Sequence, residues 1–281
     1  MAVQTGSLAL LCGAPQFLAL SYDRLRHAFG DPHTELGLRL GFVDVAQRYL
    51  CAVFAAETVG LGLAPPSAYE RLVRQKLQAP SLGDWSRAIT ALAAGLVPRD
   101  SELVAPALAR LFVDDGSGEP ISEKFRRFVE VRNERVGHRV GVQVPPETDA
   151  EAVLRETSVD FAQLCTALRA VAEYPLLYLK AVRRQEGRFQ AEFYRFTGVV
   201  PQRMQTVTTD GWLPDEHVAL LVNGARFLYL APYVSVARDR SSARYQARLW
   251  YQWDDGLRYS DIDGRNETHP ADRATENAFV R

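Results

Sequence analysis

The chain has 281 residues, of which 47% are hydrophobic, and its formal net charge at pH 7 is −1. This length is enough for one large domain or two modest ones with a buried core. The near-zero charge excludes a protein that binds nucleic acid over its whole surface, so a contact with RNA or DNA would need a local basic patch.

The cysteines and the apolar N-terminal segment bear on the compartment. Cys12, Cys51 and Cys165 are far apart and have no CxxC spacing, which is typical of buried small residues in a reducing compartment. The segment SLALLCGAPQFLAL is interrupted by a glycine and a proline, follows no basic residue, and is too short to span a membrane. We therefore expect a soluble cytoplasmic protein without a membrane partner.

The first 175 residues show the periodicity of helices. Asp31-Pro32 forms a plausible cap and first turn for a long helix over residues 34–60, whose apolar residues recur at 3.6-residue spacing. Pro106 is expected to bend a later helix. The same reasoning predicts further helices over residues 67–78, 86–96, 101–113, 121–138 and 151–174.

The pattern changes to strands near Pro175. Turn signals at Gln185-Glu186-Gly187, Asn223-Gly224 and Asp254-Asp255-Gly256 each separate two runs of β-forming residues, which predicts three hairpins. The fold class is therefore α+β, with an N-terminal helical bundle followed by an antiparallel β part. We predict two domains, a helical domain over residues 1–175 and a sensing or docking β domain over residues 176–281.

The segment RNERVGH, residues 132–138, carries the strongest functional signal. An imidazole such as that of His138 can accept or donate a proton near neutral pH. The guanidinium of Arg132 can hold a phosphate with two hydrogen bonds. Together the two groups suit cleavage of a phosphodiester without a metal ion or another cofactor.

The segment FVEVRNERVGH resembles the signature of the HEPN superfamily, in which an Arg is followed after four to six residues by a His. Asn133 takes the polar place after the Arg, and the helices over residues 30–175 match the helical frame of that family. The resemblance implies a dimeric bundle in which two motifs face each other. Many HEPN proteins are metal-independent endoribonucleases of toxin-antitoxin or antiviral systems, and others bind ligands or serve as scaffolds.

The resemblance also implies roles for individual residues. His138 would transfer the proton of the attacking ribose hydroxyl or of the leaving oxygen, Arg132 would stabilise charge on phosphorus, and Asn133 would position the phosphate. Apart from the resemblance, Glu134 lies one helical turn before His138, so it would either orient the imidazole or simply pair with it. The motif helix also carries basic residues interleaved with acidic ones, which is typical of a solvated charged face; the alternative is a groove for RNA phosphates lined by Arg126, Arg127, Arg135 and Arg139.

Helix geometry leaves alternatives open. In an ideal α-helix Arg132 and His138 lie about 120° apart, so either the helix breaks at Gly137 or the pair meets across a dimer. Equally, Gly137 with its basic neighbours is typical of a well-capped helix end. We expect an RNA-cleaving, homodimeric enzyme of a bacterial defence or toxin system. The alternative is a non-catalytic interaction or sensor module of a larger protein, and either one could have a regulatory protein partner.

Overall fold

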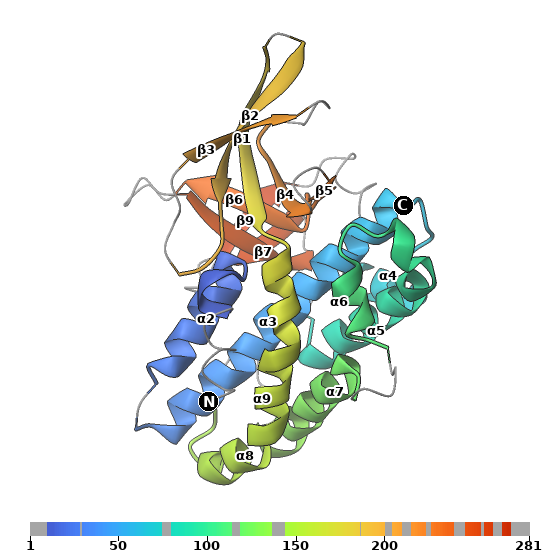
Figure 1. Cartoon of the computed structure of the whole chain (residues 1–281). Coiled ribbons are helices and arrows are strands. Elements are labelled where there is room, and N and C mark those ends of the chain that lie inside the picture. Colours follow the sequence, from blue (N-terminus) through green and yellow to red (C-terminus); the bar gives the residue numbers. More distant parts are fainter. Residues whose placement is uncertain are drawn as a thin grey trace.

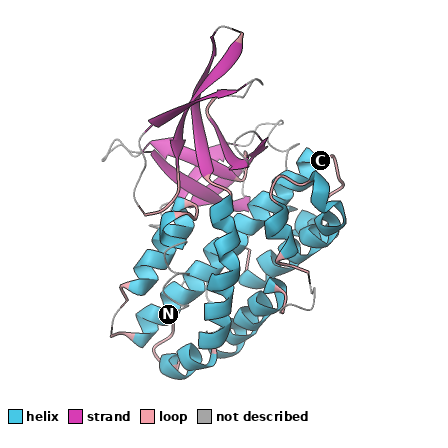
Figure 2. Cartoon of the chain, viewed as in Figure 1, coloured by secondary structure: helices cyan, strands magenta, loops and turns pink. Residues whose placement is uncertain are grey.

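The computed structural model confirms the α+β class, with helices in the N-terminal part and antiparallel strands in the C-terminal part (Figures 1 and 2). It describes residues 10–28, 30–74, 80–113, 119–136, 144–185, 187–199, 204–209, 215–222, 226–238, 245–253, 256–260 and 266–270. Within these ranges no helix is both long enough and apolar enough to cross a membrane.

The helical part is built around one long central helix with shorter helices packed on it (Figure 1). Its elements are α2 (Gln16–Arg26), α3 (Pro32–Gly60), α4 (Ser67–Arg74), α5 (Leu82–Leu96), the 3₁₀ helix η1 (Val97–Glu102), α6 (Pro106–Arg110), α7 (Ile121–Val131), the π-helical turn η2 (Arg132–Val136), α8 (Ala150–Glu156), α9 (Ser158–Ala167) and the 3₁₀ helix η3 (Leu168–Glu173).

Helix α3 starts where the sequence predicts. The Asp31 carboxylate accepts hydrogen bonds from the backbone N–H groups of His33 and Thr34, and Pro32 occupies the first helical turn. From Tyr49 to Thr58 every residue of α3 is buried, on all sides of the helix. A helix that is buried all round lies in the centre of its fold, and α3 contacts α2, α5, α8 and strands of both sheets.

Gln47 is a polar residue in the middle of this apolar helix. Its side chain is fully buried, and neither atom of its amide has a hydrogen-bond partner within the described part of the chain. Leaving a buried polar group unpaired costs about 1–3 kcal/mol. We therefore expect Gln47→Leu to raise the free energy of unfolding by about that amount, measured by denaturant melts. The exposed Gln163→Leu on α9 serves as the control, and a destabilised Gln47→Leu would show that the amide is paired.

Two predicted helices are divided. Pro106 does not bend a helix over residues 101–113 but begins a new one, because the chain is extended at Leu103 between η1 and α6. The predicted helix over residues 151–174 is interrupted at Thr157, which ends α8 and precedes α9. A proline in the first turn of a helix loses no hydrogen bond, so it favours a start over a bend.

The strands form two antiparallel sheets. The five-stranded sheet has the order β3-β2-β1-β4-β5, and the four-stranded sheet has the order β6-β7-β8-β9. The strands are β1 (Leu176–Gln185), β2 (Arg188–Arg195), β3 (Met204–Thr209), β4 (His217–Val222), β5 (Arg226–Tyr229), β6 (Val234–Arg238), β7 (Tyr245–Trp253), β8 (Gly256–Ser260) and β9 (Asn266–Pro270). The pairs β1–β2, β4–β5 and β7–β8 confirm the three predicted hairpins.

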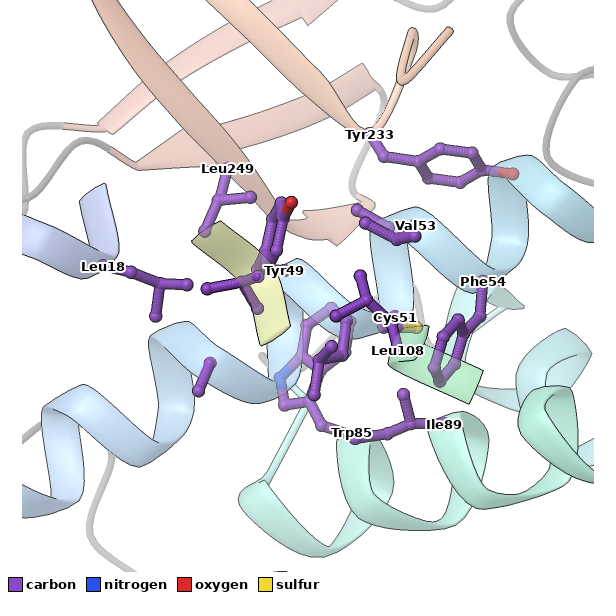
Figure 3. Close-up of a cluster of buried hydrophobic side chains, with 14 of the residues drawn as sticks. Leu18, Tyr49, Cys51, Val53, Phe54, Trp85, Ile89, Leu108, Tyr233 and Leu249 are labelled. Carbon is purple, nitrogen blue, oxygen red and sulfur yellow. The ribbon is translucent and has the colours of Figure 1, made fainter. Parts of the chain in front are cut away.

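Helices and strands share one hydrophobic core (Figure 3). The indole of Trp85 on α5 meets that of Trp250 on β7 edge to face, with 5.2 Å between the ring centroids. The hydroxyl groups of Tyr69 on α4 and Tyr233 form a buried hydrogen bond of 3.1 Å. The division of the chain into two domains at residue 175 stays a prediction.

Candidate functional site

The predicted motif begins at the C-terminal end of α7. Ile121, Phe125 and Phe128 share one face of α7 and are buried, as their helical spacing requires. After Val131 the α-helical hydrogen bonding stops, and Arg132–Val136 form a π-helical turn. Such turns are rare and frequently lie at functional sites.

The π turn presents most of its side chains to solvent. Asn133, Glu134 and Arg135 are exposed, Arg132 is half-buried, and Val136 is buried and anchors the turn in the core. The 120° offset expected between Arg132 and the histidine assumed α-helical geometry, which ends where the motif begins. The turn therefore exposes an amide, a carboxylate and the guanidinium of Arg135 within one short segment.

The turn is attached to the segment that leads into α8. The hydroxyl of Thr148 donates to the backbone carbonyl oxygen of Arg135 at 3.3 Å. The Arg135 guanidinium lies 4.0 Å from the Glu156 carboxylate at the end of α8. Because both side chains of this ion pair are more than half exposed, its contribution to stability is small. Arg135 thus has a carboxylate neighbour that an RNA phosphate would have to displace or tolerate.

A buried arginine that the sequence analysis did not select fixes the junction of α8 and α9. Arg39 Nη1 donates to the Leu154 carbonyl oxygen at 2.9 Å and to the Thr157 hydroxyl at 3.0 Å. Arg39 Nη2 donates to Glu35 at 3.1 Å, and its guanidinium lies 4.9 Å from the ring centroid of Phe161. A single cation within an apolar helical run was the sequence signal for this role.

The second half of the motif lies outside the described residues. This applies to Gly137, His138, Arg139 and Val140. The expected break at Gly137 and the predicted approach of the imidazole to Arg132 or Glu134 therefore remain predictions.

Arg126, one of the predicted RNA-binding residues, is on the exposed face of α7 between two carboxylates. Arg126 Nε donates to Glu123 at 2.8 Å, and Arg126 Nη1 donates to Glu130 one turn further along. The two carboxylates raise the pKa of Arg126, Glu123 having the largest effect. The positive charge of Arg126 is therefore largely compensated within its own helix.

Arg127 is also held by acidic groups, and these come from two other segments. It forms a bidentate pair with Glu119 before α7, one of whose hydrogen bonds measures 2.7 Å, and its Nη2 lies 2.7 Å from Asp160 on α9. The hydrogen bond from Arg127 is the main cause that lowers the pKa of Glu119 to about 2. Arg127 thus joins α7 to α9, which is a structural role beside the predicted RNA contact.

Metal sites and pockets outside the motif are the other features that could bind a ligand. Among the described residues no group of three or more His, Cys, Asp or Glu side chains is arranged to hold a metal ion. A pocket of about 240 Å³ lies between α4 and α5 and contains none of the predicted site residues; it is lined by Ala68, Arg71, Leu72, Asp84 and Arg87.

Glu57 is a buried acid with a structural role. Its Oε1 accepts hydrogen bonds from the backbone N–H groups of Val104 and Ala105, at 2.8 and 2.7 Å, just before α6. Burial raises the pKa of Glu57 above its usual 4.5, against the opposing effect of these hydrogen bonds.

This shift predicts a pH dependence of stability. An acid whose pKa is higher in the folded state than in the unfolded state stabilises the fold below the unfolded pKa, and that contribution is lost as pH rises through the folded pKa. We expect unfolding free energy to fall from about pH 4.5 upward through the folded pKa of Glu57, and Glu57→Gln to flatten this slope in melts across that range. The exposed Glu151→Gln is the control. An unchanged slope in Glu57→Gln would contradict the assignment.

Comparison with known proteins gives no relative: no family model, no curated protein and no solved structure matches the chain.

Proposed function

We propose that this protein is a metal-independent endoribonuclease of the HEPN type, acting in bacterial defence or in a toxin system. The observation that carries the proposal is the π-helical turn at Arg132–Val136, which coincides with the first five residues of the motif. Single π-helical turns are frequently found at functional sites. Asn133 is exposed, so solvent and a ligand can reach its side chain, and Arg132 is half-buried.

In this proposal the residues keep the roles that the family resemblance implies. Arg132 stabilises the charge that develops on the phosphate oxygens, and Asn133 donates a hydrogen bond to one of them. His138 transfers the proton between the ribose hydroxyl or leaving oxygen and solvent. Glu134 supports the imidazole, and Arg135 and Arg139 contact neighbouring phosphates.

The proposal is tested with the purified chain and single-stranded RNA in buffer that contains EDTA. We expect cleavage products that end in a 2′,3′-cyclic phosphate, because a positioned base activates the adjacent ribose hydroxyl. Complete loss of cleavage on addition of EDTA would contradict metal independence. Absence of cleavage over a panel of RNAs and candidate activating partners would contradict the enzyme.

A second function is favoured by the ion pairs on α7. Arg126 and Arg127 are compensated by four carboxylates, Glu119, Glu123, Glu130 and Asp160, so this face attracts phosphates less than its arginines alone would. A non-catalytic interaction or sensor module needs no RNA groove and would retain this face. That function predicts no RNA cleavage and an RNA affinity that does not change in Arg126→Ala.

We also propose that the chain forms a two-fold homodimer through its helical part, as the family resemblance implies. A composite site requires two motif segments to meet, and the π turn has three exposed side chains and contacts the end of α8 through Arg135. Light scattering at tens of micromolar should give a mass of at least two chains. A strictly monomeric protein that still cleaves RNA would show that one motif is sufficient.

A further inference from the structure

The edges of the two sheets differ in how they are protected against pairing with another strand. An edge strand presents unpaired N–H and C=O groups, and proteins normally protect it with charges, proline, bulges or a covering element. The edge strands here are β3 and β5 in one sheet and β6 and β9 in the other. Their sequences allow a direct comparison of this protection.

Three of the four edges carry such protection. The β5 edge contacts α3, and its Arg226 donates to the Glu102 carbonyl oxygen of the helical part at 3.0 Å. Strand β6 ends in Arg238 and contacts β4, and β9 contains Glu267 and Pro270.

Within the described residues, strand β3 has no such protection. Its sequence, MQTVTT, contains no charge, no proline and no glycine, and it is the longest of the four edge strands. Met204, Gln205, Thr206 and Thr208 are exposed, and Val207 is half-buried. The strand lies at the side of the β1–β2 hairpin, which projects beyond the rest of the molecule (Figure 1). No described element of the chain pairs with the outer edge of β3.

We propose that β3 pairs with β3 of a second copy of this chain, which joins the two five-stranded sheets into one. The absence of charged residues on β3 favours a second copy, because the strand can pair with itself without placing like charges opposite each other. A charged partner strand would find no counter-charge along β3. Threonine pairs across neighbouring strands are themselves favourable.

Symmetry restricts the register of this pairing. Two antiparallel strands related by a two-fold axis place residues of the same face opposite each other, so the pairing is centred on a single residue. Val207 is on the face that carries Ala191 and Phe193, which belong to a second, smaller hydrophobic cluster. Centring the pair on Val207 brings two valines together there and places Thr206 opposite Thr208 of the second copy.

The proposal is tested by adding charge to the edge. The double variant Thr206→Lys/Thr208→Lys would place lysines opposite lysines across the axis. We expect the association that depends on β3 to weaken, with its dissociation constant rising about tenfold or more, while the proposed helical dimer remains; sedimentation velocity measures both. The control is Gln185→Lys, an exposed position at the end of β1 that is away from the edge. Thermal melts establish that all variants are folded.

A cross-link provides an independent readout. Val207→Cys in a Cys12→Ser background should form a disulfide-linked dimer on mild oxidation, whereas Gln185→Cys in the same background should not. Unchanged association of the lysine variant, or no cross-link through position 207, would overturn the proposal. So would a protein that is monomeric alone and captures only a foreign strand on β3. RNA cleavage by the lysine variant is expected to be unchanged, so failure here is distinguishable from failure of the proposed enzyme.

Discussion

Replacing His138 by alanine is expected to slow RNA cleavage about 10²–10⁴-fold, which is the usual contribution of one positioned acid or base. Arg132→Ala should cost about 10²–10³-fold, the usual effect of removing one donor that stabilises charge in a transition state. Both are measured as single-turnover rates on one RNA in EDTA. His138→Ala should also remove the limb of the pH–rate profile that belongs to the imidazole.

Matched variants separate catalysis from folding. His27 is exposed on the turn after α2, and Arg99 is exposed on η1, so His27→Ala and Arg99→Ala remove the same side chains outside the motif. Both should cleave RNA at the wild-type rate. Wild-type cleavage by His138→Ala would remove the proposed proton transfer, even if the protein remained a nuclease.

A fragment of residues 1–175 is expected to lose cooperative folding. Without the strands, the indole of Trp85 and the ring of Tyr69 would lose the partners that cover them, Trp250 and Tyr233. Truncating even one large aromatic residue of a core costs about 3–5 kcal/mol, which is a large part of the 5–15 kcal/mol that stabilises a typical domain. The fragment should show a reduced helical circular dichroism signal and no sharp thermal transition.

Mixing provides the control for this truncation. Adding the fragment of residues 176–281 should restore the helical signal if the shared core is what the first fragment lacks. A fragment 1–175 that melts cooperatively near the temperature of the full chain would support the two-domain division predicted from the sequence. Loss of cooperative folding in the fragment 1–175 would show that helices and strands fold as a single unit.

The parts of the fold that depend on local signals are predictable from the sequence. Asp31-Pro32 predicts the start of α3, and the turn at Asn223-Gly224 predicts the β4–β5 pair, because capping and turn geometry depend on a few neighbouring residues. Strands β3 and β9 have no alternation of apolar and polar residues and were not predicted. Likewise, the pairing of β1 with β4 joins segments with no local signal between them.

The sequence predicts which residues belong to the candidate site, but it does not predict their backbone conformation or how they pack. The motif marks residues 132–138, but nothing in RNERV distinguishes a π turn from another turn of α-helix. The acidic partners of Arg127 come from Glu119 and Asp160, which are distant from each other in the sequence. Their effect on an RNA groove depends on how α7 packs on α9, and periodicity does not specify that packing.

The position of β3 relative to the π turn has a consequence for assembly. The β1–β2 hairpin beside β3 is at one end of the molecule, and α8, to which the π turn is attached, is at the other (Figure 1). If both proposed two-fold contacts form, each chain has two different contacts at opposite ends, which give a closed oligomer where the two axes intersect at a suitable angle and an open filament where they do not. In the open case the two contacts would alternate along a filament whose length grows with protein concentration.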